Sequence, residues 1–220
     1  MATDPTSRPS ERPVARATRD MPSLPPGISS HLLELIDIQL DRNEIASALR
    51  LATTLLPESL AGEAPVAERR AAIGLRRNDL DAASEALAAA TRPTARLHLL
   101  EAVLALRLGR LHQAKAASAT ACGSERPAPE AVVLDATIEC VGLLDETPCL
   151  SRDPSGAIRE RLAGFGIVLD RDRAAHLMRE LTALLGGRRQ AGPRCGLACV
   201  IAAALDECRE RLAGDSRAAA

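Results

Sequence analysis

One short pattern occurs three times in this chain and constrains its fold more than any other feature. The strings NEIASA, NDLDAA and GRLHQA begin at Asn43, Asn78 and Gly109. Each string has a turn residue, a polar residue, a branched aliphatic residue, two further residues and an alanine. Their first residues are 35 and 31 positions apart, 78 − 43 and 109 − 78. Self-similarity at such a spacing is typical of repeat proteins in which one supersecondary unit is stacked several times.

The amino-acid composition indicates that the repeated unit is helical. About 46% of the 220 residues are apolar, and most of these are Ala and Leu. There is no Trp or Tyr, and Phe165 is the single Phe. Ala and Leu are strong helix formers, whereas the β-branched and aromatic residues that favour strands are scarce. We therefore predict an all-α fold.

Helical periodicity on both sides of each repeated string predicts a series of antiparallel hairpins. Apolar residues recur at helical spacing before and after each turn, and Pro57, Pro93 and Pro127 follow the successive pairs. Ser30 is the expected N-cap of the first helix. The remaining segments are polar, rich in proline, or helical without the repeat. The predicted organisation is a disordered tail at 1–28, helical hairpins at 29–145, a linker at 146–153, C-terminal helices at 154–214 and a disordered tail at 215–220.

Small residues recur where the two helices of a hairpin are expected to cross. Alanine occupies this position in each unit, at Ala48, Ala83 and Ala114. This pattern resembles that of tetratricopeptide repeats, whose period is about 34 residues. The aromatic residues that are common in the first helix of that family are absent here. The resemblance implies that the hairpins stack as a short superhelix.

A narrower resemblance covers Leu32 to Leu87, about a third of the chain. It is carried by LLELIDIQL at residues 32–40 and by AAIGLRRNDLDAA at residues 71–83. These stretches resemble small tetratricopeptide-like proteins of bacterial type III secretion systems, which act as cytosolic chaperones or adaptors for needle or translocator subunits. The resemblance implies a cytoplasmic bacterial protein of this kind. Residues 126–220 have no counterpart in that family.

The resemblance to tetratricopeptide repeats also implies where a partner protein binds. The inner helices of successive hairpins line a concave groove that holds an extended peptide or a partner helix. The lining is aliphatic with charges of both signs, which suits an amphipathic helix, although some of these leucines are equally compatible with an ordinary core. The implied partner-binding residues are Leu33, Asp37, Leu40, Asp41, Glu68, Ala72, Leu75, Arg76, Leu99, Val103, Leu106 and Arg107.

No catalytic signature accompanies the repeat. The glycine spacings of phosphate-binding loops, the G-x-S-x-G elbow and the H-E-x-x-H zinc helix are absent from the sequence. Cys195 and Cys199 would face one side of a helix, with Cys208 further along, and a metal site would need partners such as Cys140, Cys149 or His176. Buried free cysteines are the simpler interpretation. We predict neither catalysis nor a cofactor, and no metal.

Charge and hydropathy narrow the choice of partner. The formal net charge is −1 with both signs interspersed, which argues against binding of nucleic acid. The apolar run 195–205 is about half of the roughly 20 residues that cross a bilayer, and no secretory leader is recognisable. We predict a cytoplasmic protein-binding chaperone or adaptor. The alternatives are a self-associating scaffold, whose helices from residue 154 onward dimerise or cover the groove, and a cysteine-based metal or redox module.

Overall fold

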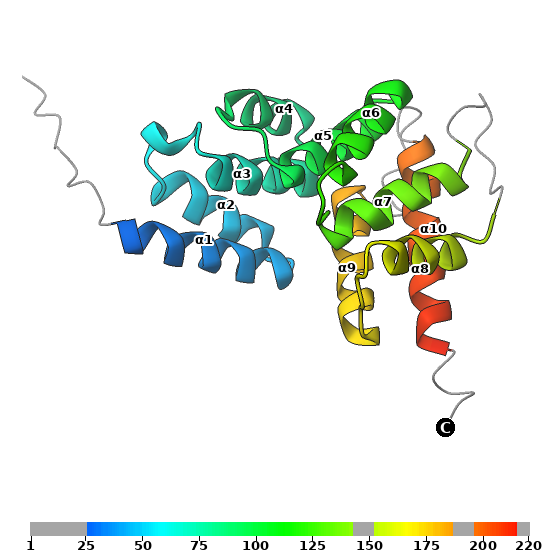
Figure 1. The fold of residues 1–220 in the computed structure, drawn as a ribbon. Coiled ribbons are helices and arrows are strands. Elements are labelled where there is room, and N and C mark those ends of the chain that lie inside the picture. The colour runs from blue at the N-terminus through cyan, green and yellow to red at the C-terminus, as the bar shows by residue number, and fades with distance from the viewer. Residues whose placement is uncertain (1–25, 143–151, 187–195, 215–220) are drawn as a thin grey trace, which may run out of the picture.

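The structure is a computed structural model that describes residues 26–142, 152–186 and 196–214. Within these ranges it contains α-helices, one short 3-10 helix (η1, Glu58–Leu60) and no strand, so the predicted all-α fold is confirmed. The helices, shown in Figure 1, are α1 (Pro26–Asp41), α2 (Ile45–Thr54), α3 (Ala64–Arg77), α4 (Leu80–Ala89), α5 (Ala95–Arg107), α6 (Leu111–Cys122), α7 (Pro129–Cys140), α8 (Pro154–Gly164), α9 (Arg171–Leu184) and α10 (Gly196–Gly214).

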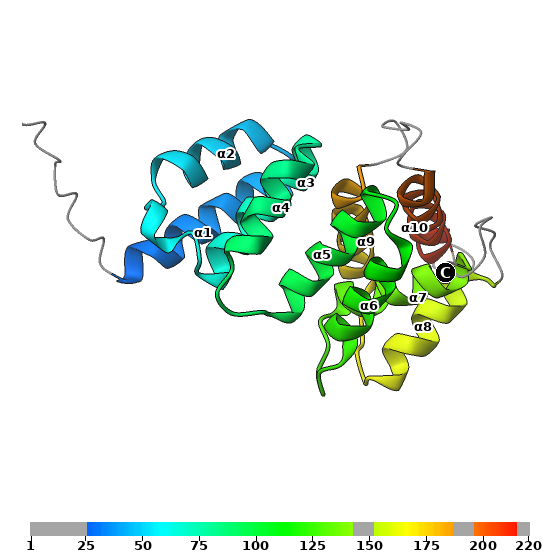
Figure 2. The same cartoon turned by 90° about the horizontal axis from the view of Figure 1, so that it is seen from above.

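Each odd-numbered helix packs against the even-numbered helix that follows it, so the described chain is a series of helical hairpins. The first helices of the hairpins also contact one another in series, from α1 to α3, α5 and α7. We call α1, α3, α5 and α7 the inner helices. Helices α1 to α4 extend to one side as an N-terminal arm, and α5 to α10 gather as a C-terminal bundle (Figures 1 and 2).

The three repeated strings form the same turn. Their first residues, Asn43, Asn78 and Gly109, have φ angles of 60°, 63° and 72°. This left-handed conformation is open to Gly at no cost and to Asn at a small one, and it ends helices in the Schellman motif. In all three turns the next amide donates to a carbonyl five residues earlier: Glu44 to Gln39 at 2.8 Å, Asp79 to Gly74 at 2.9 Å, and Arg110 to Ala105 at 2.8 Å. One local structure is therefore used three times.

Close helix crossings explain the alanines of the pattern. Ala48, Ala83 and Ala114 are completely buried. At the crossing of α3 and α4, a Cβ added to Gly74 would lie 2.8 Å from the backbone nitrogen of Ala83. No side chain larger than hydrogen fits there without moving one helix away from the other.

The element boundaries correct two details of the prediction. Helix α1 begins at Pro26, so Ser30 lies inside the helix and is not its N-cap. The predicted tail at 1–28 is wrong at residues 26–28, which are helical, and its residues 1–25 lie outside the described ranges. The predicted linker up to residue 151 and the predicted tail at 215–220 also lie outside them.

Two aspartates cap the helices that they precede. The Asp153 carboxylate accepts a hydrogen bond from the Ser155 amide at 3.1 Å, ahead of α8. The Asp170 carboxylate accepts one from the Arg173 amide at 2.8 Å, ahead of α9. Each aspartate thus satisfies a backbone donor that the first helical turn leaves without a partner.

The C-terminal hairpin returns to the inner helices. Helix α9 packs against α3 and α7, and α10 packs against α5, α7 and α8. The side chains of Leu177, Met178, Leu181 and Leu184 on α9 belong to the same hydrophobic core as the inner helices. Because α9 and α10 pack on the inner helices, only part of the inner face remains accessible.

Candidate functional site

The inner face divides into a covered part and an accessible part. Seven of the twelve residues implied for partner binding are at most 5% exposed, so our expectation of an open groove is wrong at these positions. The reason is that α9 packs on α3 and α10 packs on α5, which removes an apolar surface from water. The seven residues are Leu40, Ala72, Leu75, Leu99, Val103, Leu106 and Arg107.

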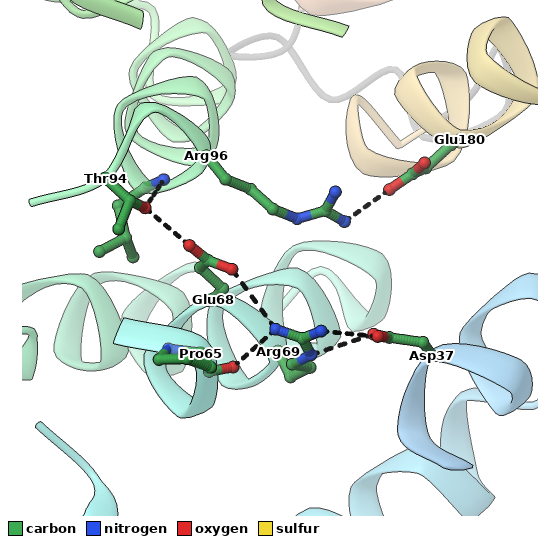
Figure 3. A network of polar contacts seen from close by, with 8 residues as sticks. Asp37, Pro65, Glu68, Arg69, Thr94, Arg96 and Glu180 are labelled. Carbon is green, nitrogen blue, oxygen red and sulfur yellow. Dashed lines mark hydrogen bonds and ion pairs between the residues drawn. The ribbon is translucent and has the colours of Figure 1, made fainter. Parts of the chain in front are cut away.

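The other five residues lie on α1 and α3 and keep contact with solvent. Leu33, Asp37, Glu68 and Arg76 are partly exposed, and Asp41 is exposed. Asp37 and Glu68 lie on the part of the inner face where α1 and α3 approach α9, shown in Figure 3, and Asp41 and Arg76 line a pocket there together with residues of α9. The accessible site therefore belongs to the N-terminal arm and has α9 as its opposite wall.

A two-pronged ion pair joins α1 to α3 in this region. The Arg69 guanidinium donates from Nε to Asp37 Oδ1 at 3.1 Å and from Nη2 to Asp37 Oδ2 at 2.6 Å (Figure 3). Its remaining nitrogen donates to the Pro65 carbonyl at 3.1 Å and to Glu68 Oε2 at 3.4 Å. A planar guanidinium and a carboxylate match in this geometry, which holds both charges in place at the surface.

Two further contacts connect α5 to its neighbours. The Thr94 hydroxyl donates to Glu68 Oε1 at 2.6 Å and also accepts from the Leu97 amide, which caps α5. Arg96 Nη2 donates to Glu180 Oε1 on α9 at 2.8 Å (Figure 3). Burial lowers the pKa of Arg96, but the surrounding carboxylates, above all Glu180, raise it to a net value above the ordinary one. Arg96 therefore stays charged and holds α9 against the inner helices.

A pocket of about 360 Å³ lies between the C-terminal ends of α1 and α3 and the outer surface of α9. Arg76 enters it from α3 and donates to the Leu40 carbonyl, and burial lowers the pKa of Arg76 despite nearby carboxylates. On the opposite wall, His176 Nε2 lies 3.8 Å from Asp41 Oδ1. The pocket is lined by Leu40, Asp41, Asn43, Arg76, His176, Arg179, Glu180 and Ala183.

Arg76 and Arg107 occupy the same position of the repeat, two residues before the turn residue. Arg76 binds the Leu40 carbonyl at the end of α1, and Arg107 binds the Leu75 carbonyl at the end of α3. Arg107 also donates to the Leu184 carbonyl at 3.2 Å, at the end of α9. A cation at a helix C-terminus interacts favourably with the helix dipole. These arginines therefore join successive helix ends, a role that the sequence analysis did not assign to them.

Several residues of the site were missed because they lie far apart in the sequence. Arg69, Thr94 and Arg96 were passed over among other polar residues of the repeats. His176 and Glu180 join the site only because α9 returns to α3, and no local pattern announces that return. The one repeated feature in the sequence that pointed to this site was the arginine two residues before the turn, Arg76 in the second unit and Arg107 in the third, and both were among the predicted residues.

The cysteines do not form a reactive cluster in the described residues. Burial raises the pKa of both Cys122 and Cys208 to about 11, and it also raises the pKa of Cys140, so these side chains are thiols at neutral pH. Cys149 and Cys195 lie outside the described ranges. In those ranges no group of three or more His, Cys, Asp or Glu side chains is placed to hold a metal ion.

Comparisons with protein-family models, with curated proteins and with solved structures give no match for this chain. None of the helices in the described part is long and apolar enough to cross a membrane.

Proposed function

We propose that this chain is a non-catalytic binding protein with tetratricopeptide-like hairpins. It acts in the cytoplasm as a chaperone or adaptor and holds an amphipathic segment of another protein. In agreement with the resemblance of residues 32–87, we propose that the partner belongs to a type III secretion system. The observation that carries the proposal is the pocket between α1, α3 and α9, with charges of both signs around it.

The composition of the pocket supports a peptide segment as its ligand. Asp41 and Arg179 are exposed on opposite walls, and Leu40 and Ala183 supply the apolar part of the lining. A volume of about 360 Å³ holds a few side chains and not a whole domain. A partner helix that places an aliphatic residue against the partly exposed Ala183, with a charged residue on either side, satisfies both features.

The polar network gives this site a defined shape before any partner arrives. Asp37 is held by Arg69, Glu68 by Thr94, and Glu180 by Arg96. A preorganised surface loses less conformational entropy on binding than a flexible one. Since its charges are near the surface, we expect them to contribute to specificity and to the association rate, with a clear dependence on salt.

The test begins with the proteins that co-purify with the full chain, followed by titration calorimetry against the recovered partner. Asp41→Arg and Arg179→Glu each reverse an exposed charge of the pocket, and we expect each to weaken binding about tenfold. Glu160→Arg, a reversal on the exposed surface of α8, is the matched control. Leu106→Asp is unsuitable because Leu106 is fully buried and the variant would unfold. Wild-type affinity in both pocket variants would place the partner elsewhere.

A further inference from the structure

Two surface grooves of the molecule are copies of one packing site. The groove of the second hairpin is lined by Ile73 and Gly74 of α3 and contacts Leu49, Ala52 and Thr53 of α2. The groove of the third hairpin is lined by Leu104 and Ala105 of α5 and contacts Ser84, Leu87 and Ala88 of α4. The groove residues correspond at a spacing of 31, and the helix residues at a spacing of 35. In both cases the second helix of one hairpin lies along the groove of the next.

The first hairpin has the same groove, and no described helix lies along it. This groove, of about 440 Å³, is lined by α1 and α2. Five of its lining residues, Gln39, Ser47, Arg50, Leu51 and Thr54, stand 35 positions before lining residues of the second groove, Gly74, Ala82, Glu85, Ala86 and Ala89.

The apolar side chains around the first groove are uncovered within the described chain. Ile38 is 42% exposed, whereas Ile73 at the equivalent position of α3 is 2% exposed. Leu35 and Leu55 beside it are 44% and 41% exposed. Terminal repeats of such arrays normally present a polar outer face. The first groove therefore has the apolar side chains of a contact between repeats, although it lies at the end of the described array.

The chain itself carries a matching sequence at the repeat spacing. The α2 residues that enter the second groove are Leu49, Ala52 and Thr53, and Leu56-Pro57 follow them. Thirty-five positions earlier the sequence has Val14, Ala17 and Thr18, followed by Met21-Pro22. The two stretches read VARATRDMP at 14–22 and LRLATTLLP at 49–57.

The other positions of this segment have the character of an outer face. In α2, the residues that face the first groove include Ser47, Leu51 and Thr54. Their counterparts 35 positions earlier are Arg12, Arg16 and Arg19. On a helix that used Val14, Ala17 and Thr18 for packing, these arginines would point to solvent, as the end of a repeat array requires. Pro13 suits the first turn of such a helix, and Pro22 suits its end.

We propose that residues 13–21 dock as a helix in the α1–α2 groove, in the pose that α2 takes over α3 and α4. The segment completes the array and covers Ile38 and Leu55. The connection 22–25 between Met21 and the first residue of α1 reaches about 17 Å when extended, beyond the roughly 8–10 Å between packed helices. Because the segment is tethered beside the groove, its effective concentration is in the millimolar range, so a small contact area suffices.

Hydrogen–deuterium exchange of the full chain, followed by mass spectrometry, tests this proposal without any partner. In the wild type we expect the amides of residues 14–21 to exchange at least about tenfold more slowly than in an unstructured peptide. Ala17→Asp places a charge in the groove and should restore fast exchange. Ala15→Asp, the same change at a position equivalent to Arg50 on the outer face, should leave the protection intact. Leu55→Asp alters the groove itself at an exposed residue and should also release the segment.

Three outcomes would overturn the proposal. The first is exchange of residues 14–21 at the unstructured rate in the wild type. The second is an equal effect of Ala15→Asp and Ala17→Asp. The third is a dimer in light scattering that Leu51→Asp dissociates while residues 14–21 stay unprotected, which would make a second copy the occupant of the groove. None of these results bears on the pocket at α9, so the proposed function is tested separately.

Discussion

At one position of the repeated inner helix, α1 carries Asp37, α3 carries Ala72 and α5 carries Val103, at spacings of 35 and 31 residues. The Asp37 side chain is 41% exposed and paired with Arg69, whereas Val103 is completely buried. The same place in the repeat is thus a surface site on α1 and a core site on α3 and α5. The side chain at this position changes from charged to small to apolar as the inner face becomes covered.

The difference shows how one helix pattern produces both a binding surface and a core. Burying a Leu or Val side chain contributes roughly 1.5–3 kcal/mol. The packing of α9 and α10 over α5 is therefore strongly stabilised by the burial of Leu99, Val103 and Leu106. On α1, the charge of Asp37 opposes the same burial, because an ionised carboxylate is costly to remove from water. The cover therefore ends where the inner face becomes charged.

Exchanging the side chains of Asp37 and Val103 is expected to give the largest change in the free energy of unfolding. We expect Val103→Asp to destabilise the bundle by about 4 kcal/mol or more, because it places a carboxylate at a fully buried site. Asp37→Val should change stability by about 1 kcal/mol or less. Urea unfolding followed by circular dichroism measures both. Val103→Ala, with an expected cost of about 2 kcal/mol, separates lost packing from buried charge. A Val103→Asp variant as stable as the wild type would mean that α5 is open in solution.

The equivalent arginines provide the second comparison. Arg107 is 1% exposed and binds the ends of α3 and α9, whereas Arg76 is partly exposed and binds the end of α1. We expect Arg107→Ala to cost about 3 kcal/mol, because it removes a buried, charged donor from two helix-end carbonyls, and Arg76→Ala to cost about 1 kcal/mol. Thermal unfolding at fixed pH measures both losses of stability and shows which of the two is larger. Equal costs would show that α9 does not depend on Arg107.

Much of the fold could be predicted because it is encoded locally. Asn43, Asn78 and Gly109 each end a helix through bonds within six residues, and the alanines that follow allow the close crossings. Asp153 and Asp170 cap the helices that they precede. The one misplaced start, Ser30, shows the limit of this approach, since Pro26 begins the helix equally well and stands earlier.

The covered part of the site could not be predicted from local signals. The bond from Arg107 to Leu184 joins residues 77 positions apart, and that from Arg96 to Glu180 joins residues 84 apart. The buried leucines of α5 have the same spacing whether a partner protein or the chain's own α9–α10 hairpin covers them. Sequence alone therefore identified the face that is covered, but it left open whether a partner protein or the helices from residue 154 onward cover it.

The smallest expected effect concerns the charges of the arm. A double-mutant cycle with Asp37→Ala and Arg69→Ala should give a coupling energy of about 1 kcal/mol or less, decreasing as salt is added, because both side chains are partly solvated. Chemical unfolding of the four chains at low and high ionic strength measures it. A coupling of several kcal/mol, insensitive to salt, would make this pair a structural element like Arg107. A small value leaves the charges of α1 and α3 with little part in stability, so that a partner can be recognised there at little cost to the fold.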